Sequence, residues 1–260
     1  MLLGVNIDHI AVLREARQIN DPNPLDALGI CKLNGADQIT IHLREDRRHM
    51  QDADTQNIIR LSQLPVNLEC SINDEMIDIA CNNKPHRVTL VPENREEVTT
   101  EGGLDIEGNY DKIKKAVDKL HANEIEVSLF IDPNNTSIEL SKKLKVEWIE
   151  LHTGSFANIY AMLYSGLEKS HHSIKELELS RDELEKRLKD SIDDIQSSSQ
   201  YAQQLGLKVA AGHGLNYQNV NHMVNIDEIE ELNIGQSIIA RSVFTGLADA
   251  IVSMKELIKR

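Results

Sequence analysis

The hydrophobic and polar positions of the chain follow two alternating periods, one typical of strands and one typical of helices. Eight short runs rich in β-branched residues predict strands at residues 2–7, 38–43, 65–70, 87–91, 126–131, 148–153, 208–213 and 231–235. Between them, apolar positions at helical spacing predict helices within residues 24–36, 52–64, 73–83, 110–122 and 237–259. Strands that alternate with helices form a parallel sheet, and eight such units close it. We therefore expect an α/β fold, a (β/α)8 TIM barrel in which residues 1–260 form a single domain, rather than an open doubly wound sheet.

Two segments are longer than a plain barrel needs. Residues 92–109 are polar and contain three glycines after the fourth predicted strand, and loops of this length are typically lids or binding loops, so we expect a lid. The second segment, residues 168–205, predicts an extra or extended helical segment of one or two helices. Its apolar positions recur at helical spacings: Ile174, Leu177, Leu184, Leu188, Ile192 and Ile195. It is either an ordinary barrel helix with a solvated face or an added helix for contact between subunits.

Composition and charge disfavour several classes of function. The net charge of -14 and the 3% of aromatic residues disfavour nucleic acid as a partner, because phosphate backbones need surplus Lys and Arg and bases stack on aromatic rings. No run of about 18 apolar residues is present, so we expect no membrane contact and a cytoplasmic location. Three cysteines without C-x-x-C spacing suggest neither a disulfide framework nor a zinc site, which fits a reducing compartment.

Polar side chains gather at the carboxyl ends of the predicted strands, where barrel enzymes carry their chemistry. They are Asn6, Asp8 and His9 in the first strand region, His42 and Arg44 in the second, Asn67 and Glu69 in the third, Glu150 and His152 in the sixth, and His213 in the seventh. One such residue is usually structural, but five strands with the same pattern favour an active site. Facing carboxylates and imidazoles shift one another's pKa values, which provides the acid and base groups for proton transfer near pH 7.

Two further features indicate anion binding. Arg44, Arg47, Arg48 and His49 follow the second predicted strand, and guanidinium groups bind phosphate bidentately, although a solvated cluster paired with neighbouring carboxylates is the alternative. The segments AGHGL and NIGQSIIAR place glycines after the seventh and eighth strands, where barrels often bind phosphate through backbone N–H groups and a helix N-terminus. Two separate anion sites predict that the bound substrates carry two phosphate groups.

Missing motifs narrow the chemistry. No lysine lies at a predicted strand end, which argues against an enzyme-bound Schiff base. Neither a G-x-G-x-x-G nor a Walker A sequence is present, which argues against dependence on nicotinamide cofactors or ATP. Several strand-end residues could ligate a divalent ion, but the usual closely spaced pair of histidines is missing. Proton transfer around substrate carbonyls remains.

The same segments resemble the pyridoxine 5'-phosphate synthase family. The resemblance is carried by GVNIDHIAVLREAR, GADQITIHLREDRRH, NLE, LVPENREEVTTEGGLD, VSLFID, IELHTG, AGHGLNY and ELNIGQSIIARSVFTGL, which span nearly the whole chain except about residues 156–200. It implies a transferase that condenses two small phosphorylated substrates, 1-deoxy-D-xylulose 5-phosphate and 3-amino-2-oxopropyl phosphate, and that releases inorganic phosphate and water. It also implies no metal, no organic cofactor and a homo-octamer.

The resemblance assigns roles by motif. It implies that His42 and Glu69 accept protons, that His213 donates one and that Glu150 stabilises a transition state. The deoxyxylulose phosphate would be bound by Asp8, His9, Arg44, His49 and Thr99, and the aminoketone phosphate by Asn6, Arg17, Gly214, Gly235 and Gln236. The family commonly has histidine where this chain has Gln236, and an amide donates a neutral hydrogen bond without imidazolium charge. The charged stretch 167–197 is also longer than the family pattern.

Two other functions stay open on the residues alone. A metal-dependent phosphosugar epimerase or isomerase would also need a barrel, a phosphate site and paired acids, and bound stoichiometric metal would favour it. A non-catalytic assembly protein could use segment 168–205 as its contact surface, and loss of binding on truncation of that segment would favour it.

Overall fold

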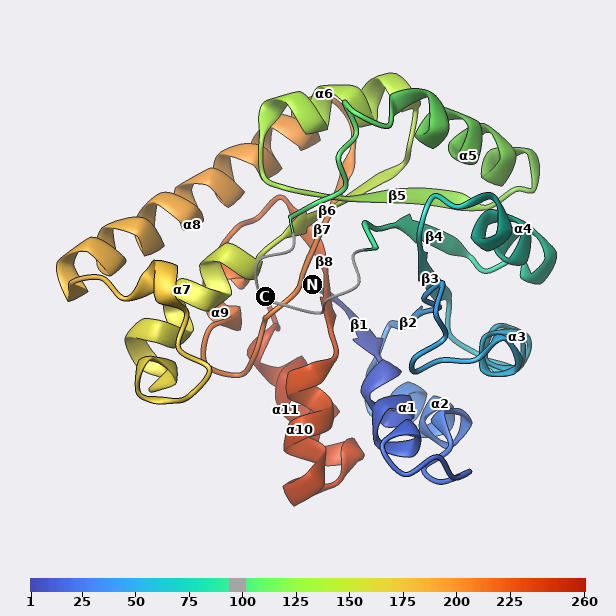
Figure 1. Ribbon diagram of the computed structural model, residues 1–260, viewed down its shortest axis with the longest axis horizontal. Coiled ribbons are helices and arrows are strands. Elements are labelled where there is room, and N and C mark those ends of the chain that lie inside the picture. The colour runs from blue at the N-terminus through green and yellow to red at the C-terminus, as the bar shows by residue number, and fades with distance from the viewer. Residues whose placement is uncertain (94–101) are drawn as a thin grey trace.

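The strands of the computed structural model, which describes residues 1–93 and 102–260, form a closed parallel barrel in chain order (Figure 1). They are β1 Leu2–Asn6, β2 Gln38–His42, β3 Val66–Cys70, β4 Arg87–Leu90, β5 Glu126–Ile131, β6 Trp148–His152, β7 Lys208–Gly212 and β8 Ile229–Ile234. Each overlaps a predicted strand, so the predicted TIM barrel is confirmed.

Helices surround the barrel (Figure 1). They are α1 Asp8–Glu15, α2 Ala27–Leu33, α3 Asp52–Leu61, α4 Asp74–Asn83, α5 Tyr110–Ala122, α6 Asn135–Leu144, α7 Gly154–Tyr164, α8 Arg181–Gln204, α9 Val220–Val224, α10 Gln236–Thr245 and α11 Leu247–Leu257. Several begin at side-chain caps, because the side-chain oxygens of Asn73, Asn134 and Ser180 accept backbone N–H groups of the first turns of α4, α6 and α8. In the described parts of the chain, no helix is both long and apolar enough to cross a membrane.

The helical segment expected at residues 237–259 is divided into two helices. Gly246 lies between α10 and α11 with φ of 81°, outside the helical region. Glycine adopts this backbone conformation readily, so the chain changes direction there and α11 packs against α10.

The extended helical segment is confirmed as α8, which has 24 residues. Leu184, Leu188 and Ile195 of the predicted stripe are buried on one side of it. Ile174 and Leu177 are not part of this helix, because they lie in and beside the short 3-10 helix η3 Lys175–Leu177, which follows η2 Leu167–Lys169. Both side chains still pack against the core, so the apolar spacing reflects burial in two kinds of structure.

The barrel interior is polar. Thr89 Oγ1 donates to Asn67 Oδ1 at 2.9 Å, and Thr40 Oγ1 donates to Asn233 Oδ1 at 3.0 Å. Arg87 of β4 reaches across to Glu231 of β8, with Nη1 2.8 Å from Oε1. The apolar core lies between the strands and the helices, where side chains such as Ile41 and Leu68 are fully buried. The polar interior continues into the cavity at the carboxyl ends of the strands.

Candidate active site

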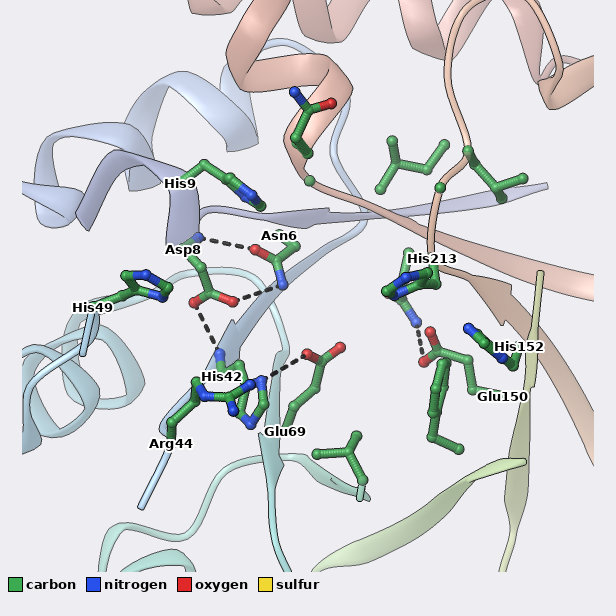
Figure 2. A pocket seen from close by; sticks show the side chains of 18 of the residues that line it. Asn6, Asp8, His9, His42, Arg44, His49, Glu69, Glu150, His152 and His213 are labelled. Carbon is green, nitrogen blue, oxygen red and sulfur yellow. Dashed lines mark hydrogen bonds and ion pairs between the residues drawn. The ribbon is translucent and has the colours of Figure 1, made fainter. Parts of the chain in front are cut away.

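A cavity of about 450 Å³ lies at the carboxyl ends of the strands, a size that suits a small ligand. Most predicted site residues line it: Asn6, Asp8, His9, His42, Arg44, His49, Glu69, Glu150, His213, Gly214, Gly235 and Gln236. Figure 2 shows His42 and Arg44 on one side of this cavity, His213 and Glu150 on the other, and Glu69 between them. The fold thus brings together residues more than 200 positions apart in the chain.

Two predicted site residues are not placed in the cavity. Arg17 lies in the turn after α1, is exposed and does not line the cavity. Thr99 lies outside the described residues, as do residues 94–101 of the lid expected at residues 92–109.

Asp8 connects the first two strands. It follows the strand predicted at residues 2–7 and is the first residue of α1. Its Oδ1 accepts the backbone N–H of His42 at 2.9 Å, and its Oδ2 accepts Asn6 Nδ2–H at 2.8 Å. Asn6 Oδ1 in turn accepts the backbone N–H of Asp8 at 2.9 Å. These bonds hold His42 and Asn6 at adjacent positions of the cavity wall.

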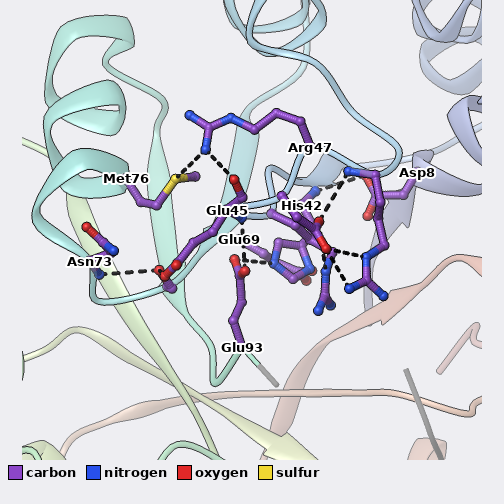
Figure 3. Close-up of polar contacts among 12 residues, drawn as sticks. Asp8, His42, Glu45, Arg47, Glu69, Asn73, Met76 and Glu93 are labelled. Atoms are coloured by element: carbon purple, nitrogen blue, oxygen red, sulfur yellow. Dashed lines mark hydrogen bonds and ion pairs between the residues drawn. The ribbon is translucent and has the colours of Figure 1, made fainter. Parts of the chain in front are cut away.

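His42 lies between two carboxylates (Figure 3). Its Nδ1 is 4.0 Å from Glu69 Oε2, and its Nε2 is 3.4 Å from Glu93 Oε1. Glu93 Oε2 also accepts the backbone N–H of Glu45 at 2.9 Å. Sequence reasoning missed Glu93, although it follows the fourth strand as the other polar residues follow theirs.

The surroundings of Glu93 determine its charge. Burial alone would raise the pKa of Glu93, but hydrogen bonds from His42 and from the Glu45 backbone lower the pKa below its ordinary value. Glu93 is therefore a carboxylate at neutral pH, and it can hold the imidazole of His42 in one orientation.

Glu69 and Glu150 have the opposite electrostatic environment. Burial, together with the charges of Glu150 and Asp8, raises the pKa of Glu69 well above its ordinary value. Burial and the nearby Glu231 raise the pKa of Glu150 to about 7, although Asn233 Nδ2 donates to Glu150 Oε2 at 2.8 Å. A carboxyl group with a pKa near 7, as Glu150 has, can act as an acid as well as a base near neutral pH.

His213 follows β7 in an uncommon backbone conformation, with φ of 80°. Thr153 Oγ1 donates to its carbonyl oxygen at 2.7 Å. Burial and the neighbouring His152 lower the pKa of His213 to about 4, so its imidazole is neutral at physiological pH. A neutral imidazole can donate one proton and accept another.

The predicted arginine cluster is divided between the cavity and the surface. Arg44 and His49 line the cavity. The other two arginines form ion pairs with neighbouring carboxylates: Arg47 Nη2 is 2.6 Å from Glu75 Oε1, and Arg48 Nη2 is 2.6 Å from Asp46 Oδ2. Neither of these arginines lines the cavity. Only Arg44 and His49 of this cluster are therefore placed to meet a ligand there.

The part of the cavity wall that follows β8 offers backbone donors. Gln236 is the first residue of α10, and Gly235 precedes it. Helix N-termini attract anions through unpaired N–H groups and the helix dipole. Gly214 lines the cavity as well, so residues expected to bind each of the two anions border one cavity, together with the acid and base groups.

The predicted residues do not gather as a metal site. Across residues 1–93 and 102–260, no group of three or more His, Cys, Asp or Glu side chains is arranged to hold a metal ion. The cavity lining does combine the Arg44 guanidinium, a group that can bind phosphate, with carboxyls and imidazoles that can exchange protons.

The chain is similar over its full length to proteins of one family. The sequence profile of the family described as "Pyridoxal phosphate biosynthesis protein PdxJ" matches residues 3–260. The chain is 75% identical to the pyridoxine 5'-phosphate synthase of Aliarcobacter butzleri, over 100% of this chain and 99% of that protein. It is 66% identical to the pyridoxine 5'-phosphate synthase of a Sulfurovum species, over 99% and 100% of the two chains.

Solved structures with little sequence identity share the fold. A 3-hexulose-6-phosphate synthase matches with a TM-score of 0.60 at 12% identity, over 100% of both chains. The phosphoribosyl anthranilate isomerase of Thermococcus kodakaraensis matches with a TM-score of 0.57 at 10% identity, over 100% of this chain and 99% of that one. These likenesses support the barrel alone, whereas the profile and the full-length relatives show that the chain belongs to the PdxJ family of pyridoxal phosphate biosynthesis proteins.

Proposed function

We propose that this chain, acting as one domain over residues 1–260, condenses 3-amino-2-oxopropyl phosphate with 1-deoxy-D-xylulose 5-phosphate to give pyridoxine 5'-phosphate, inorganic phosphate and water. The observation that carries the proposal is that two sets of groups suited to bind anions and several acid and base groups line one cavity of about 450 Å³. Two phosphorylated substrates need two anion sites, and a reaction with several dehydrations needs more than one proton donor and acceptor.

In this proposal the cavity residues divide into two substrate sites. Asp8, His9, Arg44 and His49 bind the deoxyxylulose phosphate, and Asn6, Gly214, Gly235 and Gln236 bind the aminoketone phosphate. The family resemblance adds Thr99 to the first site and Arg17 to the second. The exposed position of Arg17, away from the cavity, gives no support for its role within one chain.

The chemistry begins when the substrate amine attacks the sugar ketone and forms an imine between the two substrates. His42 and Glu69 then accept protons, His213 donates one, and Glu150 stabilises the charge that develops during phosphate loss, ring closure and dehydration. The raised pKa values support these roles, because a carboxylate with a raised pKa is a stronger base, and Glu150, with a pKa of about 7, can gain or lose a proton near neutral pH.

The first experiment is to incubate the purified, chelator-treated protein with both substrates and to follow phosphate release and pyridoxine 5'-phosphate formation together. We expect product from the pair and from neither substrate alone. Folded protein that forms no product would reject the proposal, and activity that returns only with a divalent ion would reject a metal-free reaction.

Substitution of the proposed acid and base groups tests their roles. Replacing His42, Glu69 or His213 with an inert residue should lower turnover about 10²- to 10⁴-fold while the circular dichroism spectrum stays that of the wild type. A variant with near wild-type turnover would remove that residue from its proposed role.

We also propose that the protein works as a homo-octamer in the cytoplasm. The exposed apolar side chains of Leu33 and Phe244, at 84% and 89% exposure, support burial against other copies of the chain. The three cysteines are buried and free, which suits a reducing compartment. Sedimentation at working concentration tests the assembly, and a mass below that of eight chains would contradict it.

A further inference from the structure

Asp132 and His152 lie beside His213, and none of the roles above uses them. His152 ends β6 and lines the cavity, and Asp132 follows β5 directly (Figure 2 shows His152 next to Glu150 and His213). His152 Nδ1 is 3.2 Å from Asp132 Oδ1. Because a carboxylate can only accept a hydrogen bond, this contact places a proton on Nδ1 of His152.

The ring of His152 packs directly against the ring of His213. The two centroids are 4.9 Å apart and the planes meet at 69°, an edge-to-face arrangement. Phe130 lies against both rings, with centroids 5.0 Å from His152 and 6.3 Å from His213. His213 is therefore held from one side by rings that do not belong to its own loop.

Gly154 makes room for both imidazoles at the start of α7. A Cβ atom on Gly154 would lie 2.5 Å from His152 Nε2 and 3.1 Å from His213 Cδ2. The first distance is too short for any real side chain, so even one methyl group at this position would displace the ring of His152.

Asp132 is itself held in place. The backbone N–H of Gly103 donates to the same Oδ1 atom, at 2.9 Å. The hydrogen bond from His152 lowers the pKa of Asp132 against the effect of burial, and the Gly103 donor lowers it further. The carboxylate thus has two fixed donors, and its own position fixes His152.

We propose that Asp132 and His152 are positioning residues for His213: the carboxylate orients the imidazole of His152, and that ring holds the imidazole of His213 in the cavity. The role of His213 in turnover rests on the proposed function, but the packing that orients it does not. Acid and base groups need a supporting shell, because misplacement of a reacting group by about 1 Å can cost about 100-fold in rate.

The test compares Asp132→Ala with Asp132→Asn. The alanine variant removes the carboxylate oxygen that accepts both bonds, so turnover should fall about 10- to 100-fold, the range typical of a lost supporting contact, with less change in KM for either substrate. The asparagine variant should restore most of the turnover, because its amide oxygen can accept both the Gly103 and the His152 donors.

Nitrogen-15 NMR of the histidine rings gives a readout that needs no substrate. The ring signals of His213, assigned from their loss in His213→Gln, should shift in Asp132→Ala and stay near the wild-type positions in Asp132→Asn. Gly154→Ala displaces the same rings without touching Asp132, and it should also lower turnover and shift the His213 signals. It serves as the second variant if Asp132→Ala does not fold.

The chain offers a matched control in another carboxylate and imidazole pair. His121 Nε2 is 3.2 Å from Glu147 Oε2, and neither residue lines the cavity. Glu147→Ala should leave turnover and the His213 signals unchanged. Wild-type turnover and wild-type His213 signals in either Asp132→Ala or Gly154→Ala would overturn the proposal. A wild-type protein that forms no product would instead reject the proposed function, while the NMR comparison would still decide the positioning contact.

Discussion

Glu150 shows how burial inside a barrel changes the chemistry of one residue. Its side chain is 3% exposed and lies near Glu231, so that its pKa rises from 4.5 to about 7. The folded state therefore holds a proton that the unfolded state has already lost at the same pH. This difference links the protonation of a proposed active-site group to the stability of the whole protein.

The linkage predicts the direction of the pH dependence. Stability from the Glu150 proton is fully present below about pH 4.5 and is lost as pH rises to about 7, a loss of about 3 kcal/mol. Glu150→Gln cannot titrate and can still accept the bond from Asn233, so its free energy of unfolding should fall less over this range. Urea denaturation of both proteins at pH 4.5 and pH 8 measures the difference. Equal changes in the two proteins would contradict the raised pKa.

At the scale of elements, α8 is longer than its position in the barrel requires. It lies beside α6 and α7, and Leu184 near its N-terminus is 5% exposed. The helix starts there because Ser180 Oγ accepts the Glu183 backbone N–H and the acidic residues Asp182 and Glu183 occupy the first turn. Its N-terminal half therefore contributes to the core without lining the cavity.

This position predicts separate effects on stability and activity. Leu184→Ala should lower the free energy of unfolding by about 2–5 kcal/mol through lost burial and the cavity left behind. Turnover should not change, since Leu184 does not line the cavity. Lys186→Ala, at an exposed position of the same helix, is the control and should be close to the wild type. Parallel denaturation and kinetic measurements check both effects, and a large loss of turnover in folded Leu184→Ala would connect α8 to the site.

The N-terminus of α10 makes a second prediction at this scale. Gln236 presents a neutral amide beside a helix N-terminus. Gln236→His should lower KM for 3-amino-2-oxopropyl phosphate at pH 6, where an imidazole with its ordinary pKa of about 6.5 is mostly charged. At pH 8 the gain should vanish, because the ring is neutral. Steady-state kinetics at both pH values measure this difference in KM. An equal KM for variant and wild type at pH 6 would show that no substrate phosphate binds at Gln236.

For the whole molecule, the ion pair between Arg87 and Glu231 connects opposite sides of the barrel. Both side chains are buried, and Glu231 also accepts hydrogen bonds from Gln38 and Asn233. A buried charge without its partner is costly because nothing replaces the lost hydration. Closure of this barrel thus depends on a matched set of polar groups rather than on apolar layers.

Removing one partner should therefore cost more than removing both. Arg87→Ala should destabilise the protein by about 3–5 kcal/mol, and the double variant Arg87→Met, Glu231→Leu should recover much of the loss. Chemical denaturation of the wild type and both variants measures these differences in the free energy of unfolding. A double variant less stable than the single one would show that the other partners of Glu231 dominate.

The local sequence pattern was enough to predict the strands and the gathering of polar residues at their carboxyl ends. Each strand appears within two residues of its predicted start, because the strands are short segments rich in β-branched residues whose apolar positions face the surrounding helices. The polar residues at their ends converge for the same topological reason. The placement of Arg17, the outward turn of Arg47 and the contact of Glu93 with His42 could not be predicted, because each depends on loops that no periodic pattern describes.

The sequence by itself determined the alternation of strands and helices, the polar strand ends and the family, since these depend on residue type and order. Only the tertiary structure decided which groups share an environment. Glu150 lies on β6 and Glu231 on β8, and His152 ends β6 while His213 follows β7. The raised pKa of Glu150 and the ring contact between His152 and His213 therefore exist only once the barrel closes. Electrostatic and packing energies depend on distance and burial in space, and order along the chain specifies neither.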